Sequence, residues 1–189
     1  MKRTVGALIG VVALAIVLGA CGSKDAKDAK DAQAPAATAP AKVAATPVPA
    51  PSGKLVLKLN GMLSNHNQGG ALAFDQRTLD TLPTRSATLY EPFLKKDVQF
   101  TGIPMSELLG RAGISEQATK VQLHALDDYK VDFQVADLMA PGVLLATRAD
   151  GAPIPIAKGG PVRLVFPPDS TVGKNKDFWI WSIDSITVS

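Results

Sequence analysis

Residues 100–104 read Phe-Thr-Gly-Ile-Pro, and residues 159–167 read Gly-Gly-Pro-Val-Arg-Leu-Val-Phe-Pro. The first stretch predicts the end of a strand and the start of a helix, because Pro104 suits the first position of a helix. The second stretch is apolar on both sides of Arg163, which is typical of a strand buried in a core. A strand that runs straight into a short helix, and a later buried strand, together favour a sheet-based domain.

Short alternating or apolar runs separated by turn residues continue through residues 54–189. Asp75 is a predicted N-cap for a helix over 76–82, and Gly113 fits the left-handed residue that ends the helix after Pro104. Many short strands with two or three brief helices predict one β-rich α+β domain. The predicted strands are 54–59, 86–90, 98–103, 120–126, 130–134, 143–147, 154–156, 162–166 and 183–188, and a further helical turn is expected at 136–139.

Composition limits the function of residues 54–189. Lys and Arg are as numerous there as Asp and Glu, so a nucleic-acid partner has no electrostatic basis. The chain has a single cysteine, Cys21, so no disulfide can form inside this domain. Two histidines without a domain cysteine also give no ligand spacing typical of zinc.

The N-terminus predicts export. Lys2 and Arg3 precede an apolar run over 5–20, which is shorter than the about 20 residues that a spanning helix needs. Residues 1–20 are therefore a predicted signal peptide. Leu-Gly-Ala before Cys21 resembles a bacterial lipoprotein signal, which implies lipidation of Cys21 by acyl chains such as palmitate. The alternative is an ordinary signal peptide in which the cysteine occurs by chance.

Residues 21–53 are a predicted tether. Lys-Asp-Ala occurs three times from Lys24, and Ala and Pro then dominate. Such a segment has too few apolar side chains to offset the entropy of ordering, so disorder is expected. The resemblance to lipoproteins implies a periplasmic domain anchored to a membrane, and the residues after Cys21 favour the outer membrane.

The order of motifs across residues 97–188 resembles the molybdopterin-binding domain of the sulfite-oxidase family. These motifs are residues 100–104, the turn Asp127-Asp128-Tyr129, residues 159–167 and a late Trp181. The resemblance implies a pterin-type ligand and a metal held by a cysteine near residues 89–91. Tyr90 stands there instead, and its hard oxygen is a poor substitute for a soft thiolate. We therefore expect no metal ligands, no molybdenum and no catalytic residues.

A pterin has a flat π-face and a hydrogen-bonding edge, so aromatic and polar side chains are the expected contacts. Arg163 needs a ligand phosphate or a carboxylate, because an unpaired charge in an apolar strand is costly. Trp181 is also consistent with the core, His66 with a solvated loop, and Arg163 with a structural salt bridge. The candidate contacts are Tyr129, Trp179 and Trp181 as a platform, Asn65, His66, Asp128 and Arg163 for the edge or phosphate, and Gly160 in the phosphate stretch implied by the resemblance.

The sequence favours a membrane-tethered periplasmic lipoprotein that binds a pterin without redox turnover. It would pass its ligand state to a neighbouring membrane signalling protein, with closure of the loop 60–70 providing two states. One alternative is a molybdopterin-dependent oxidoreductase with atypical metal ligation. The other is a structural interaction module whose cleft is filled by side chains.

Overall fold

The computed structural model describes residues 47–189. The predicted signal peptide, the lipidation site Cys21 and most of the tether lie outside the described residues. None of the helices within 47–189 is long and apolar enough to cross a membrane.

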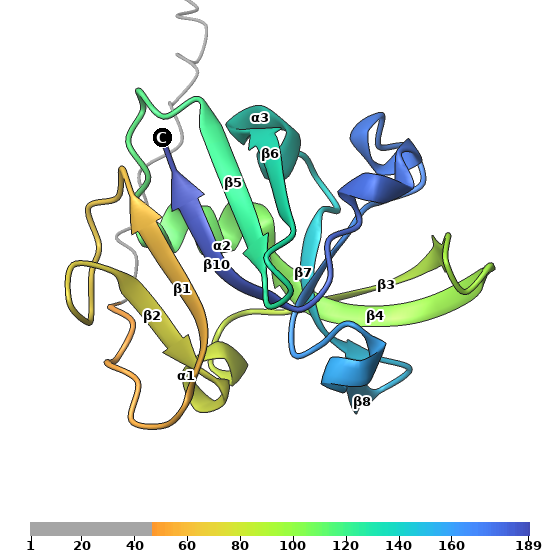
Figure 1. Cartoon of the computed structure of the whole chain (residues 1–189), viewed down its shortest axis with the longest axis horizontal. Coiled ribbons are helices and arrows are strands. Elements are labelled where there is room, and N and C mark those ends of the chain that lie inside the picture. The colour runs from red at the N-terminus through yellow and green to blue at the C-terminus, as the bar shows by residue number, and fades with distance from the viewer. Residues whose placement is uncertain (1–46) are drawn as a thin grey trace, which may run out of the picture. The chain divides into compact units, whose positions relative to one another are not determined.

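One five-stranded sheet joins the start and the end of the described chain (Figure 1). Its order is β2-β1-β10-β5-β6, in which β1 and β10 run parallel and the other neighbours are antiparallel. The β5–β6 hairpin closes around residues 126–129, which include the turn motif Asp127-Asp128-Tyr129. The strands are β1 (Leu55–Gly61), β2 (Leu72–Asp75), β5 (Lys120–Ala125), β6 (Lys130–Gln134) and β10 (Ile183–Val188).

A second sheet among the described residues has the order β3-β4-β7-β8, with β9 also paired to β7. Its β3–β4 hairpin pairs Arg85 with Gly102 at one end and Glu91 with Lys96 at the other, and it extends away from the first sheet (Figure 1). The strands are β3 (Arg85–Glu91), β4 (Lys96–Pro104), β7 (Leu144–Ala149), β8 (Ala152–Pro153) and β9 (Arg163–Val165).

The caps predicted at Asp75 and Gly113 are present. Asp75 caps α1 (Gln76–Asp80) through a reciprocal capping box with Thr78, but α1 ends at Asp80 rather than at residue 82. Pro104 is the residue before α2 (Met105–Ala112) rather than its first residue, and Gly113 ends α2 in the left-handed region at φ 61°. The remaining helices are α3 (Val135–Met139) and the 3-10 turns η1 (Ile156–Lys158), η2 (Val172–Lys174) and η3 (Lys176–Phe178).

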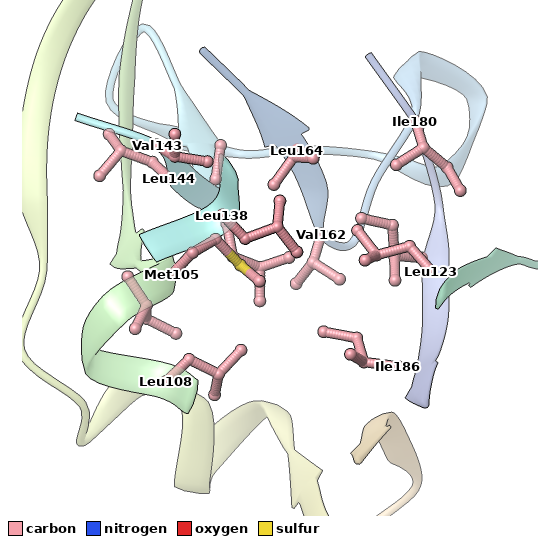
Figure 2. Packing of buried hydrophobic residues seen from close by; sticks show 14 of the residues in the cluster. Met105, Leu108, Leu123, Leu138, Val143, Leu144, Val162, Leu164, Ile180 and Ile186 are labelled. Atoms are coloured by element: carbon pink, nitrogen blue, oxygen red, sulfur yellow. The ribbon is translucent and has the colours of Figure 1, made fainter. Parts of the chain in front are cut away.

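The core lies between the helices and both sheets. Met105 and Leu108 of α2 pack with Leu138 of α3 and with strand residues such as Leu164 and Ile186 (Figure 2). The predicted β-rich α+β class with a few short helices is confirmed.

Two sequence predictions about strands were wrong. Residues 72–75 form β2, which the sequence did not predict because four consecutive buried residues show no alternation. Residues 154–156 were predicted as a strand, but none of them is in a strand, because β8 ends at Pro153 and Ile156 begins η1. Pro153 and Pro155 flank this position and have no N–H to donate to a ladder, which explains the early end of the strand.

Candidate functional site

Trp179 and Trp181 lie in the segment between η3 and β10, outside any strand. They therefore do not share a strand face, as residues two positions apart would in an extended segment. Trp179 is buried, its ring centroid lies 6.0 Å from that of Phe166, and its Nε1 donates to the carbonyl of Gly173 at 2.8 Å. Trp181 is half-buried, and its ring packs against that of Phe93 in a T-shaped arrangement, with 5.1 Å between the ring centroids.

A cavity of about 300 Å³, the aromatic pocket, lies against both tryptophans. Tyr129 forms part of its wall and is held in place because its hydroxyl donates to the carbonyl of Asp177 at 3.0 Å. The pocket thus joins the β5–β6 turn to η3 and to the tip of the β3–β4 hairpin. Its lining comprises Phe93, Ala125, Asp127, Tyr129, Lys176, Asp177, Trp179, Ile180 and Trp181.

A second cavity of about 300 Å³, the Tyr90 pocket, also borders Trp179. Tyr90 stands where the sequence placed the family's metal-ligating cysteine, and its side chain is exposed. Lys174 contributes a cation to the same wall. The full lining is Tyr90, Pro92, Phe166, Pro167, Pro168, Gly173, Lys174 and Trp179.

Arg163 is satisfied by a carboxylate from its own chain. Its Nη2 donates to Oε1 of Glu91 at 2.8 Å, and the side chains of Arg163 and Glu91 are 3% and 0% exposed. The other carboxylate oxygen of Glu91 accepts from the backbone N–H of Leu94. Burial lowers the pKa of Arg163, and the bond to Glu91 opposes that shift. The expected structural salt bridge is therefore the one that forms.

The ring of Trp181 is enclosed on several sides. The guanidinium carbon of Arg163 lies 4.4 Å from the ring centroid, within cation–π range. A Cβ added to Gly159 would lie 2.8 Å from the ring, so glycine permits this close packing. Among residues 47–189, Trp181 Nε1 and Arg163 Nε are buried side-chain nitrogens without a hydrogen-bond partner. Such orphaned donors are unusual in folded proteins.

Gly160 is buried, and its role is steric. A Cβ at Gly160 would lie 1.8 Å from the carbonyl oxygen of Ile154, and the bond from Gly160 to Pro161 is cis. Gly160 lines neither the aromatic pocket nor the Tyr90 pocket.

Asn65 and His66 lie elsewhere, beside a separate cavity of about 200 Å³ near the end of α2. The Nδ2 of Asn65 donates to the carbonyl of Arg111 at 2.7 Å, which satisfies one of the free carbonyls at that helix end. Ser64 makes a similar bond to Gly113. The loop 60–70 is thus fastened to α2, and neither Asn65 nor His66 lines the aromatic pocket.

Asp128 occupies the β5–β6 turn with φ 68° and an exposed side chain. Its carboxylate lies 3.3 Å from Nε2 of His124, whose Nδ1 lies 2.7 Å from Asp184. The bond to Asp184 raises the pKa of His124, and burial opposes that shift. The Asp128 carboxylate therefore pairs with His124, and Asp128 does not line the aromatic pocket.

Of the predicted contacts, the structure brings together Tyr129, Trp179 and Trp181. Sequence reasoning missed Phe93 and Glu91, which lie in or beside the turn of the β3–β4 hairpin. The signal for Phe93 was the pair Phe93-Leu94, two large apolar residues in a turn that ought to be polar. Glu91 gave no local signal.

Among residues 47–189, the side chains near the expected ligand position offer oxygen donors and no thiolate. Cys21, the one cysteine of the chain, lies outside the described residues, and within 47–189 no group of three His, Cys, Asp or Glu side chains is placed to hold a metal ion. The oxygens near the expected ligand position are the phenol of Tyr90 and the carboxylate of Glu91, which is already bound to Arg163.

Three comparisons relate the chain to known proteins. The profile described as "Oxidoreductase molybdopterin binding domain" matches residues 81–187. No curated protein matches the chain. Among solved structures, the sulfane dehydrogenase SoxCD of Paracoccus pantotrophus is similar, with a TM-score of 0.56, 19% sequence identity and a match over 70% of this chain. The match covers 37% of the SoxCD chain, so the likeness concerns the fold of one part of that protein.

Proposed function

This chain belongs to the oxidoreductase molybdopterin-binding domain family, and from that membership we propose that its aromatic pocket binds a pterin ring without a protein-held metal and without redox turnover. The observation that carries the proposal is the set of four aromatic side chains around one cavity of about 300 Å³. Cavities that bind small molecules have roughly this size or larger, with mostly apolar walls and a few polar groups.

The chemistry of the lining suits a pterin. Stacking on Tyr129 or Trp179 recognises the flat ring, since aromatic faces pack favourably against one another. Asp127 and Asp177 offer acceptors for the amino and ring N–H groups of a pterin, and Lys176 offers a cation for a phosphate or ring oxygen. These side chains would bind and orient the ligand.

The proposed lack of turnover depends on the position of Tyr90. A metal bound to a pterin dithiolene would supply oxygen-atom or electron transfer, and in this fold a cysteine is expected to hold it. Tyr90 offers a phenol with a high ordinary pKa, which is a hard ligand and a poor partner for a sulfur-bound metal. We therefore assign no catalytic step to any residue of this chain.

A sensor also needs two states, and Phe93 is the residue suited to provide them. Its ring forms a T-shaped contact with the ring of Trp181, yet Phe93 itself is exposed and lies in a hairpin turn. Displacement of Phe93 by a ligand would move the hairpin tip, because a ligand shifts a conformational equilibrium only through different contacts in the two states. The loop 60–70, first expected to close over the ligand, is fastened to α2 and lines a different cavity.

The proposed setting is the periplasmic side of a bacterial membrane. It follows from the lipoprotein-like motif at Cys21 and the Ala/Pro-rich segment after it. A lipid-anchored binding domain would reach a neighbouring membrane protein across this segment and report its ligand state there.

The test is to purify the full chain and measure released pterin fluorescence and molybdenum in the same sample, and then to titrate the ligand-free chain with free pterin. We expect binding of pterin with less than about one tenth of a molybdenum atom per chain. Molybdenum near one atom per chain would favour the oxidoreductase alternative. If the purified chain releases no pterin and added pterin does not bind, the structural alternative is favoured.

The structural alternative has one observation of its own. The Glu91–Arg163 pair and Trp181 fill the interior beside residues 89–91, where the metal-ligating cysteine was expected. At the tip of the β3–β4 hairpin, the side chains of Tyr90, Phe93 and Leu94 are exposed. Exposed large apolar side chains that cluster are typical of protein contacts. Pull-down of a membrane partner that depends on Leu94 but is insensitive to pterin would favour this alternative.

A further inference from the structure

A cavity of about 450 Å³, the Ile156 pocket, lies near the start of β1 and is larger than either cavity around Trp179. It shares no lining residue with those two cavities. Its wall combines the start of β1, the β2–α1 junction, the β5–β6 turn, η1 and the start of β10. The lining residues are Ser52, Gly53, Lys54, Leu55, Val56, Asp75, Gln76, Arg77, Leu126, Ile156, Pro161 and Asp184.

The apolar part of the wall is exposed to solvent. Leu55, Leu126 and Ile156 are 40%, 53% and 65% exposed, and they come from three segments far apart in the sequence. Large apolar side chains that gather around one cavity favour the binding of an apolar group, because burial removes their surface from water.

The two carboxylates of the wall are already used by the protein. Asp75 accepts hydrogen bonds from the backbone N–H groups of Ser52, Gly53 and Thr78 at 2.9, 2.8 and 2.8 Å. Asp184 lies 2.7 Å from Nδ1 of His124 and accepts from the hydroxyl of Ser185 at 3.2 Å. Donors from the protein itself thus occupy oxygens of both carboxylates, although Asp75 keeps its negative charge.

The two cations of the wall are available. Within residues 47–189, neither Lys54 nor Arg77 has a carboxylate within ion-pair distance. The β1–β2 ladder pairs Leu55 with Asp75, which brings Lys54 and Arg77 to the same end of that ladder. The wall thus carries two cationic side chains that make no direct ion pair with the described residues.

We propose that the Ile156 pocket binds an amphipathic organic anion, whose apolar body lies on Leu55, Leu126 and Ile156 and whose single anionic head contacts Lys54 and Arg77. An apolar wall with a cationic rim is complementary to such a molecule, and Arg binds carboxylate and phosphate heads in a forked geometry. This site is independent of pterin binding.

The test uses octanoate as the anionic probe and 1-octanol as its neutral match, titrated calorimetrically into the full chain. We expect octanoate to bind at least about tenfold more tightly than octanol, the difference expected for a charge-assisted contact. The double variant Lys54→Gln/Arg77→Gln should lose about tenfold in octanoate affinity. The matched control Lys58→Gln/Lys120→Gln removes the same charge from exposed residues outside the pocket and should leave the affinity unchanged.

The apolar half is tested by Ile156→Ser, with Met139→Ser as the control at another exposed apolar residue. We expect Ile156→Ser to weaken binding of octanoate by about fivefold or more, because fewer methylene groups are buried, and Met139→Ser to leave it unchanged. The proposal is overturned if octanoate does not bind at millimolar concentration, if octanol binds as tightly, or if the Lys54/Arg77 variant binds like its control.

Discussion

The Nη2 atom of Arg163 lies 2.8 Å from Oε1 of Glu91, although the two residues are 72 positions apart in the sequence and both are buried. This ion pair joins β9 to the end of β3, beside the aromatic ring of Trp181. Buried ion pairs pay a large desolvation cost, so each charge depends on its partner. The pair fixes the hairpin that carries Tyr90 and Phe93.

Glu91→Ala should therefore destabilise the domain by about 3–5 kcal/mol, because it leaves the Arg163 charge buried without a partner. Urea denaturation measures the loss. Glu107→Ala removes the half-buried partner of Arg111 in α2 and should cost only about 0.3–0.5 kcal/mol. Replacing both members, Glu91→Leu with Arg163→Met, should recover most of the lost stability. Equal effects of the Glu91 and Glu107 variants would show that the buried pair is unimportant.

The chain has two tyrosines, and each lines a different one of the two cavities around Trp179. Tyr129→Ala should weaken binding of free pterin by about 1–3 kcal/mol, the usual effect of removing one stacked aromatic side chain. Tyr90→Ala should leave that affinity unchanged, because Tyr90 lines only the other cavity. Both residues are exposed, so both variants should fold. Fluorescence titration checks the difference, and the reverse order of effects would place the ring in the Tyr90 pocket.

Local patterns predicted most of the strands and the caps of α1 and α2, since alternation, Asp75 and Gly113 act within a few residues. Partners distant in sequence were not predictable in the same way. Arg163 indicated that it needed a counter-charge, but nothing near Glu91 marked it as that partner. Asn65 and Asp128 looked like ligand contacts because they are polar loop residues, yet α2 and His124 use them.

The resemblance to a family drew attention to residues 179–181, both of whose tryptophans line the aromatic pocket, but it did not predict the geometry of their side chains. A short irregular segment after η3 replaces the extended strand, so Trp179 packs on Phe166 while Trp181 packs on Phe93. Periodicity arguments fail where the backbone is neither helix nor strand.

His124 should make the stability of the domain depend on pH. Asp184 raises the pKa of His124 above its ordinary 6.5, with a smaller contribution from Asp128, while burial and the charge of Lys130 oppose the shift. The contribution of charged His124 to the free energy of unfolding is fully present below pH 6.5, and it is lost as the pH rises through the raised pKa of the folded state. Unfolding measured between pH 5 and 9 should show the loss in the natural chain and in His66→Gln, the variant of the other histidine. A His124→Gln variant with an identical pH profile would be incompatible with this role.

Asp75 should act in the opposite direction at acid pH. Backbone N–H groups of Thr78, Gly53 and Ser52 bind its carboxylate, and they hold its pKa well below the ordinary 3.8. Its stabilisation is present above pH 3.8 and is lost as the pH falls toward the depressed pKa. Asp75→Ala should therefore lower the melting temperature at pH 6 more than Asp80→Ala, which removes only an exposed bond to Gln76. The difference between the two variants should shrink in acid, and a constant difference would count against a charged Asp75.

Two glycines test the packing of β4 against β7 with substitutions of the same size. A Cβ on Gly102 would lie 2.3 Å from the carbonyl oxygen of Leu145 and 2.6 Å from Cα of Ala146, and backbone atoms in a sheet cannot move aside as side chains do. Gly102→Ala should thus destabilise the domain by about 1–3 kcal/mol or more, as overpacking of a dense core does. Gly110, in α2, has open space around its Cβ position, so Gly110→Ala should stabilise by about 0.5–1 kcal/mol through helix propensity. Chemical denaturation of both variants should give changes of opposite sign, and a neutral Gly102→Ala would mean that β4 and β7 are farther apart than their register requires.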